Sequence, residues 1–260
     1  MKIGVCLPSL GLPLEQALVE CPGLGIRGLQ VWPVKELAPE GLDLDARKSL
    51  RAKIEGHQME ICALGGGLNL MVPDKHRENI ERFKEFLDLS RDIGSGIVTT
   101  ESKSPPANVS IDEAWDLFMR GIREIALHAQ KTGTYFAVEL GPGCLIDTPD
   151  KFLKLAEGVK SPNLKVNYDP GNVIMAGLDP IEGLRTLREF VVHTHMKDAV
   201  YSPGGKYSEV ALGTGALDLP RYIKELRAIG YDGYLTIERE TGPDPVGDVR
   251  RAVGLLRELL

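Results

Sequence analysis

The chain has 260 residues, of which 43% are hydrophobic and 26% charged, and these fractions are typical of a folded globular protein rather than a disordered one. A formal net charge of −6 disfavours a protein that binds nucleic acid or an anionic membrane by neutralising phosphates, although a local basic patch is compatible with it. No apolar stretch reaches the roughly 18 residues of a membrane span, and the apolar start is too short for a signal peptide, so we expect a cytoplasmic protein with no nucleic-acid or membrane partner.

Eight short apolar runs predict β-strands, and amphipathic stretches separate them. The runs cover residues 3–8, 28–32, 59–64, 96–100, 135–140, 164–168, 190–196 and 233–237. The clearest helices are predicted at residues 74–93, 110–131 and 244–260, where apolar side chains recur every three or four residues. Strand and helix alternate from end to end, as stacked βα units require.

This alternation predicts an α/β fold, and we expect a (β/α)₈ TIM barrel that forms one domain over residues 1–260. An open, doubly wound sheet is disfavoured because the turn at residues 8–13 lacks the pattern G-x-G-x-x-G. The longest irregular stretch is expected at residues 198–216, over the catalytic face of the barrel. In this stretch Gly213 and Gly215 either form a simple turn or let backbone amides approach a ligand such as a phosphate.

Four of the predicted strands end in a side chain that can bind a hard metal ion. Glu139 ends the fifth strand, Asp169 follows the sixth, His195 lies near the end of the seventh, and Glu238 follows the eighth. Taken singly, each glutamate reads as a helix cap or surface group, the aspartate before Pro170 as a turn initiator, and the histidine as a core imidazole. Together they favour a metal site, because the carboxyl ends of parallel barrel strands meet at one rim.

The ligand set predicts one divalent cation. Three carboxylates and one imidazole suit Mn²⁺, Mg²⁺ or Co²⁺ better than a structural zinc, which prefers cysteine and histidine. A formal charge of about −1 on the loaded site leaves room for neutral oxygen donors, so we expect a sugar or polyol as the small-molecule substrate. Glu139 and Glu238 approach from separate directions and can move a proton from one face of a hydroxy-carbonyl to the other, through a metal-stabilised enediolate.

Further residues near strand ends are candidates for binding the substrate. Trp32 shares a strand face with Gln30, and its ring either stacks on a sugar or packs under a loop. Glu101 closes the fourth strand and either accepts a substrate hydroxyl or stays solvated. Lys197 either binds a substrate oxygen or pairs with nearby carboxylates, and His193 lies on the same face of the seventh strand.

At these motifs the chain resembles the xylose isomerase-like TIM barrels, which include sugar isomerases, ketose 3-epimerases, inosose dehydratases and repair enzymes of the endonuclease IV type. Three segments are similar to family motifs: V-H-T-H-M-K-D at 192–198 to the strand H-x-H-x-K-D, L-G-T-G-A-L-D at 212–218 to the loop G-x-G-x-x-D, and G-Y-D-G-Y-L-T-I-E at 230–238 to the eighth-strand signature. The resemblance covers nearly the whole chain. It implies a single metal, Mn²⁺ first with Mg²⁺, Co²⁺ or Zn²⁺ as alternatives, and two glutamates that also serve as acid and base. The ligands that it implies are Glu139, Asp169, His195 and Glu238.

The chain departs from the ketose 3-epimerases at three positions. Leu145, Asn172 and Tyr201 stand where those enzymes carry a glutamate, a histidine and an arginine that bind the substrate. The resemblance therefore implies a retained metal with a substrate that is not a free ketose bound in that way. Asn172 can still donate a hydrogen bond to a substrate hydroxyl.

The leading hypothesis is a metal-dependent isomerase or epimerase acting on a sugar or polyol. The alternative is a lyase of the inosose dehydratase type, which shares the same chemistry up to the loss of water. Two further hypotheses are DNA repair of the endonuclease IV type, disfavoured by the acidic charge and the five histidines, and a barrel that binds sugar without turnover. Apolar side chains on the barrel helices, such as the last one, are compatible with a homo-oligomer.

Overall fold

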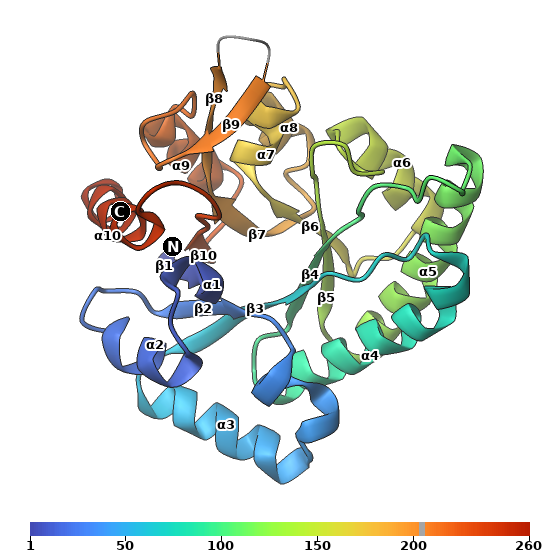
Figure 1. Ribbon diagram of the computed structural model, residues 1–260, viewed down its shortest axis with the longest axis horizontal. Helices are drawn as coiled ribbons and strands as arrows, with labels where there is room; N and C mark the ends of the chain where they lie inside the picture. The colour runs from blue at the N-terminus through green and yellow to red at the C-terminus, as the bar shows by residue number, and fades with distance from the viewer. Residues whose placement is uncertain (203–205) are drawn as a thin grey trace.

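Eight parallel strands close into a barrel in the computed structural model, which describes residues 1–202 and 206–260 (Figure 1). Each strand pairs with the next one along the chain, and the last pairs with the first. The barrel strands are β1 (Lys2–Cys6), β2 (Gly28–Val31), β3 (Glu60–Gly66), β4 (Ile97–Glu101), β5 (Tyr135–Glu139), β6 (Leu164–Tyr168), β7 (Val191–Met196) and β10 (Tyr234–Ile237). The predicted strands and the (β/α)₈ fold are confirmed. Residues 203–205, part of the stretch expected to be irregular, lie outside the described residues.

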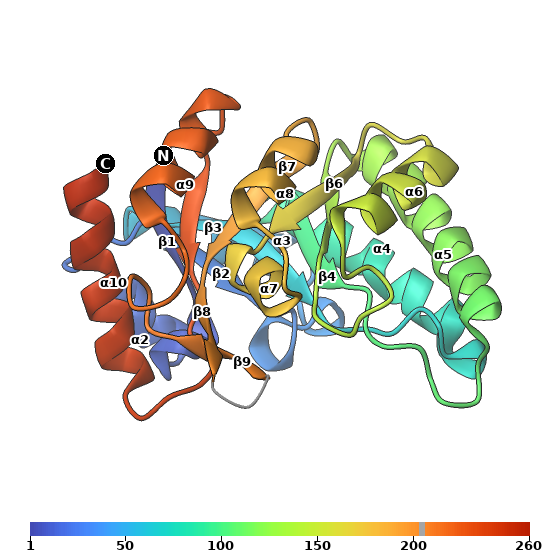
Figure 2. The same ribbon diagram turned by 90° about the horizontal axis from the view of Figure 1, so that it is seen from above.

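Helices surround the strands (Figures 1 and 2). The α-helices are α1 (Leu7–Leu10), α2 (Leu14–Glu20), α3 (Leu44–Gly56), α4 (His76–Asp92), α5 (Ile111–Thr132), α6 (Pro149–Val159), α7 (Pro170–Met175), α8 (Pro180–Thr186), α9 (Leu219–Ala228) and α10 (Pro245–Leu259). Three 3₁₀ turns add to them: η1 (Lys35–Leu37), η2 (Pro39–Gly41) and η3 (Pro73–Lys75). In the described part of the chain, none of these helices has the length and apolar character to cross a membrane.

The long helices begin and end where the sequence predicts. Before α5, the Ser110 hydroxyl accepts a hydrogen bond from the amide of Glu113, and Gly133 ends the helix with a φ of 70°. The apolar face of each helix then packs on the barrel: Phe83 of α4, for example, meets Phe136 of β5 edge to face, with ring centroids 5.0 Å apart. The first strand ends earlier than predicted, because Pro8 lies in the first turn of α1.

Inside the ring, several side chains are polar and fully buried. Gln30, Thr99, His193 and Thr236 are each no more than 2% exposed. They come from four different strands, and hydrogen bonds join some of them across the barrel: Gln30 bonds to Thr99 and to His193. The layer of side chains inside the barrel, beneath the carboxyl ends of the strands, is therefore polar and partly hydrogen-bonded rather than apolar.

The stretch after β7 is not wholly irregular, which corrects the expectation from the sequence. It contains an antiparallel pair, β8 (Asp198–Ser202) and β9 (Lys206–Val210), in which Ala199 lies opposite Glu209. The Glu209 carboxylate accepts hydrogen bonds from the backbone amides of Glu240 and Thr241, 3.0 and 3.1 Å away, and lies 3.1 Å from Arg239. These bonds attach the pair to the segment that follows β10.

The Asp198 carboxylate organises the glycine loop that follows this pair. Its oxygens accept hydrogen bonds of 2.8–3.0 Å from the backbone amides of Ala199, Gly213, Gly215 and Leu217. A Cβ atom at Gly215 would lie 2.1 Å from an Asp198 oxygen, so only glycine fits there. The amides at 213 and 215 are thus occupied within the protein, and the suggestion that they bind a phosphate was wrong.

This arrangement predicts an unequal response to removing two aspartates. Asp198→Ala is expected to lower the free energy of unfolding by about 3 kcal/mol or more, because it leaves four buried or partly buried N–H groups without an acceptor. Asp179→Ala, which removes an exposed cap from α8, should cost only about 1 kcal/mol. Urea unfolding of both variants measures the difference, and equal losses would contradict a special role for Asp198.

Candidate metal centre

Four side chains from four strands meet at the carboxyl ends of the barrel strands. Glu139 is the last residue of β5, His195 lies within β7, and Asp169 and Glu238 directly follow β6 and β10. Each offers one ligand atom, and these four atoms all lie within 4.8 Å of one another. The juxtaposition expected from the sequence is thus present in the structure.

The imidazole of His195 lies at the centre of this cluster. Its Nδ1 atom is 3.2 Å from Glu238 Oε2, and it is 3.5 Å both from Glu139 Oε1 and from Asp169 Oδ2. His195 is 1% exposed. Three carboxylates therefore converge on one ring nitrogen in a region largely closed to water.

Two asparagine amides hold Glu139. Asn167 Nδ2 donates to Glu139 Oε2 at 2.7 Å, and Asn172 Nδ2 donates to Glu139 Oε1 at 2.8 Å. Both asparagines are buried. Asn167 lies two residues before Asp169 on the same strand face, and this spacing is the signal in the sequence that places it beside the cluster.

Asp169 divides its two oxygens between the fold and the cluster. Oδ1 accepts a hydrogen bond of 3.0 Å from the backbone amide of Asn172 and so caps α7. Oδ2 is buried and accepts no hydrogen bond among the described residues, although Lys197 Nζ lies 3.4 Å away. A buried carboxylate oxygen without a donor is unfavourable by itself and fits a position that a cation would satisfy.

The two glutamates differ in their protonation. Burial raises the pKa of Glu139 to about 7, although His195 opposes the shift. Burial also disfavours the charged form of Glu238, but His195 and Lys197 outweigh it and hold the pKa of Glu238 below its usual range. At neutral pH Glu238 is therefore ionised, whereas Glu139 lies near its midpoint.

Two basic groups supply the balancing charge. Burial lowers the pKa of His195, but Glu238 and Glu139 outweigh burial, so the pKa of this imidazole is well above its usual value. Lys197 Nζ lies 2.6 Å from Glu238 Oε2 and 2.8 Å from Glu240 Oε2. Burial opposes the charge on Lys197 as well, yet Asp169 and Glu238 keep its pKa well above the usual value. The cluster thus attracts and retains positive charge.

A cavity of about 180 Å³ opens directly over the cluster. Three of the five residues expected to bind substrate line it: Trp32, Glu101 and Lys197. Glu101 forms an ion pair of 2.7 Å with Lys103, a lining residue that the sequence analysis did not single out. The Trp32 ring lies against Gly65, where a Cβ would come within 2.6 Å of it.

The other two residues expected to bind substrate, Asn172 and His193, lie beside the cluster but outside the cavity lining. Asn172 donates to Glu139, as described, and His193 bonds to Gln30 across the barrel interior. Burial and the neighbouring His195 lower the pKa of His193 to about 3, so its ring is neutral. Neither Asn172 nor His193 lines the cavity, and each contacts another side chain of the centre.

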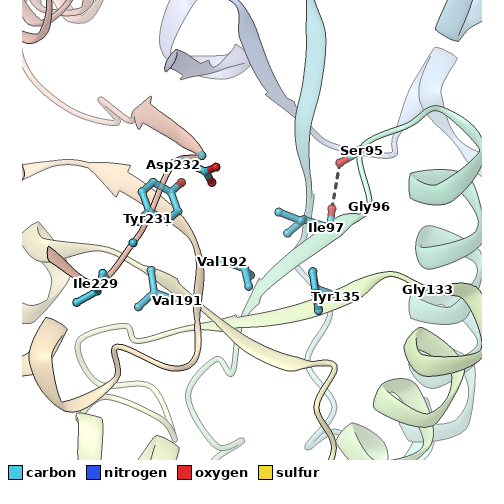
Figure 3. Close-up of a pocket in the computed structure, with 12 residues that line it drawn as sticks. Ser95, Gly96, Ile97, Gly133, Tyr135, Val191, Val192, Ile229, Tyr231 and Asp232 are labelled. Atoms are coloured by element: carbon cyan, nitrogen blue, oxygen red, sulfur yellow. Dashed lines mark hydrogen bonds between the residues drawn. The ribbon is translucent and has the colours of Figure 1, made fainter. Parts of the chain in front are cut away.

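A second cavity, of about 390 Å³, lies at the opposite end of the barrel (Figure 3). It is lined by the first residues of β4, β5 and β7 and by the turn before β10, with Tyr135, Val191 and Tyr231 among them. Its lining contains one carboxylate, that of Asp232, and no histidine or cysteine. Chemistry in TIM barrels is located at the carboxyl end of the strands, so the smaller cavity over the cluster is the candidate site.

Comparisons with known proteins agree with this architecture. The family described as xylose isomerase-like TIM barrel matches residues 20–259. Over 89% of this chain and 86% of the relative, the sequence is 22% identical to the inosose dehydratase of Geobacillus kaustophilus. It is 23% identical to the fructoselysine 3-epimerase of Escherichia coli O157:H7, over 88% of this chain and 86% of that protein.

Solved structures show the same fold. A xylose isomerase domain protein from Planctomyces limnophilus superposes with a TM-score of 0.82 at 28% identity, covering 100% of this chain and 96% of that one. A Mycobacterium smegmatis barrel in complex with magnesium gives a TM-score of 0.80 at 18% identity, over 99% and 96% of the two chains. The IolI protein with a bound zinc atom gives 0.81 at 20% identity, over 100% and 96%.

Proposed function

The chain belongs to the xylose isomerase-like TIM barrel family, and on that premise we propose that it is a divalent-metal-dependent enzyme that transfers a proton on a sugar or polyol. The leading reaction is isomerisation or epimerisation next to a carbonyl group. One observation carries this proposal: two carboxylates of the cluster, Glu139 and Glu238, face one cavity from separate strands. Such a pair is suited to remove a proton and to return one.

Glu139, Asp169, His195 and Glu238 would hold the cation. Two buried carboxylates and one partly buried carboxylate around one imidazole, with an Asp169 oxygen that accepts no hydrogen bond from the described residues, fit a divalent ion. When bound, the ion would polarise a substrate carbonyl and stabilise the negative charge that develops on its oxygen. The oxygen-rich set of ligands favours Mn²⁺ or Mg²⁺. Similar solved structures contain magnesium or zinc, so Mg²⁺ and Zn²⁺ are also candidates.

The protein groups then divide the proton transfer. Glu238 is ionised and can accept the proton next to the carbonyl, whereas Glu139 can hold a proton near neutral pH and deliver it. A bound cation would lower both pKa values, so the order of the two pKa values, and not their size, supports this assignment. The asparagine amides at 167 and 172 fix the Glu139 carboxylate in place.

The rest of the cavity would orient the substrate. Glu101 and Lys103 form a charged pair at one wall, which can accept and donate hydrogen bonds to hydroxyls. Trp32 supplies an apolar surface at another wall for the C–H face of a sugar ring. Lys197 lines the cavity and would contact a substrate oxygen while it remains paired with Glu238.

A lyase of the inosose dehydratase type is the second candidate. The Geobacillus kaustophilus relative carries that name, and the positions that bind substrate in ketose 3-epimerases hold Leu145, Asn172 and Tyr201 here. Leu145 is buried and Tyr201 is 61% exposed on β8. In this reaction the same base would remove the proton, and the acid would protonate a departing hydroxyl group instead of carbon.

Adding a divalent cation is expected to stabilise the protein. At a concentration 100 times the dissociation constant, binding contributes about 2.7 kcal/mol, which corresponds to a rise in Tm of roughly 5–10 °C for a chain of this size. Thermal unfolding with Mn²⁺, Mg²⁺ or Zn²⁺, before and after chelation, measures this shift. If none of the three ions raises the Tm, the proposed metal site is wrong.

A pair of substitutions tests which carboxylates hold the ion. Asp169→Asn keeps the cap on α7 but removes a charge from the cluster, so we expect metal affinity to fall at least tenfold, equivalent to about 1.4 kcal/mol. Glu101→Gln changes a carboxylate in the same cavity but outside the cluster, and it should alter the affinity less than twofold. Calorimetric titration compares the two variants, and equal effects would argue against the assigned ligands.

Reactions in deuterated water separate the two candidate activities. With a panel of ketoses and inososes, an epimerase or isomerase leaves a product of unchanged formula that carries solvent deuterium, whereas a dehydratase product has lost water. Glu238→Gln should slow turnover by roughly 10²–10⁴-fold, because it removes the base. Mass spectrometry of the products gives the answer. Binding without any turnover across the panel would support a non-catalytic sugar-binding barrel instead.

A further inference from the structure

The side chain of Gln30 lies between the two histidines of β7. Its Oε1 atom is 2.9 Å from His193 Nε2 and 2.9 Å from His195 Nε2. Gln30 is 1% exposed and belongs to β2, which is separated from β7 in the ring by β1 and β10. The contact therefore crosses the interior of the barrel and links His195 of the metal centre to strand β2.

An amide oxygen can only accept hydrogen bonds, so both Nε2 atoms that face it must carry hydrogen. In a neutral imidazole the other nitrogen, Nδ1, then holds the lone pair. On His195 this is the atom that faces the three carboxylates, 3.2 Å from Glu238 Oε2. The tautomer set by Gln30 is thus the one whose Nδ1 can bind a cation when the imidazole is neutral.

The surrounding hydrogen bonds fix which way the Gln30 amide points. Its Nε2 atom donates to Thr99 Oγ1 at 3.4 Å, and Thr99 Oγ1 donates in turn to the carbonyl of Leu64 at 3.4 Å. If the amide were reversed, its oxygen would face a hydroxyl whose one hydrogen is already donated to Leu64. His193, as the second donor, then holds the amide oxygen in position.

Among the residues that the structure describes, no other neighbour of His195 Nε2 offers a comparable acceptor. Asn167 Nδ2, 3.2 Å away, is a donor whose orientation is set by its bond of 2.7 Å to Glu139 Oε2. The Cys6 thiol, 3.8 Å away, is a weak partner. The described residues thus leave Gln30 as the group that decides the tautomer.

We propose that Gln30 is a positioning residue that acts through His195, fixing its Nε2–H tautomer so that Nδ1 binds the metal, with His193 bracing the amide. This inference rests on the proposed metal site. Groups that orient a metal-bound histidine in this way typically change metal affinity by 10–100-fold when they are removed. The first histidine of the H-x-H motif thereby gains a role that does not involve the substrate.

The test uses the full-length protein and Zn²⁺, which is diamagnetic, as the probe. In ¹⁵N-histidine NMR spectra of the zinc-loaded wild type, we expect His195 to carry hydrogen at Nε2 and to show a coordinated Nδ1. Gln30→Leu, which removes the acceptor, should weaken zinc binding by 10–100-fold in calorimetric titration. Gln30→Glu keeps an acceptor at the same place and should preserve the NMR signature. Thr99→Val removes the bond that orients the amide but keeps the amide oxygen, so it should weaken zinc binding less than Gln30→Leu does.

The outcomes separate this inference from the proposed function. A zinc-loaded wild type whose His195 carries hydrogen at Nδ1, or a Gln30→Leu variant that binds zinc as tightly as the wild type, would overturn the role of Gln30 and leave the metal site intact. A wild type that binds no divalent ion would overturn both. The wild-type spectrum decides the tautomer even if Gln30→Leu fails to fold.

Discussion

Negative charge gathered at the ends of buried strands is the constraint on which the rest of this structure depends. Three carboxylates lie around His195 Nδ1, and little water can neutralise them because each side chain is at most 10% exposed. Lys197 and His195 offset part of the charge, yet one Asp169 oxygen accepts no hydrogen bond from any residue in the described ranges. A buried anionic cluster of this kind is stable only with nearby positive charge, and this requirement connects the fold to the proposed chemistry.

The barrel supports this cluster with a second layer of neutral amides. Asn167 and Asn172 donate to Glu139, whereas Gln30 accepts from both histidines of β7. Donors therefore contact the carboxylate, and an acceptor contacts the imidazole, as the charges of these groups require. Because the amides carry no net charge, they orient the cluster without changing its charge balance. Such support fixes geometry at a site where small displacements are costly.

The segment after β7 performs a similar function for the backbone. Asp198 follows Lys197 directly and accepts four backbone hydrogen bonds from the glycine loop and its neighbours. The β8–β9 pair is attached through Glu209 to the residues that follow Glu238. The segments that carry Lys197 and Glu238 are thus joined on the outside of the site as well as within it.

The sequence by itself determined the alternation of strands and helices and the four strand-end ligand candidates. The strands and helices follow from local periods of two and of 3.6 residues in the sequence. The ligand candidates follow from the rule that parallel barrel strands bring their carboxyl ends to one rim. The β8–β9 pair was missed because its short strands lie next to a glycine-rich segment that reads as a loop. Only the tertiary structure decided which side chains meet across the barrel. It placed Asn172 on Glu139, Gln30 between two histidines, and Asp198 on the loop amides, because these contacts depend on rotamers and on distances between segments far apart in sequence.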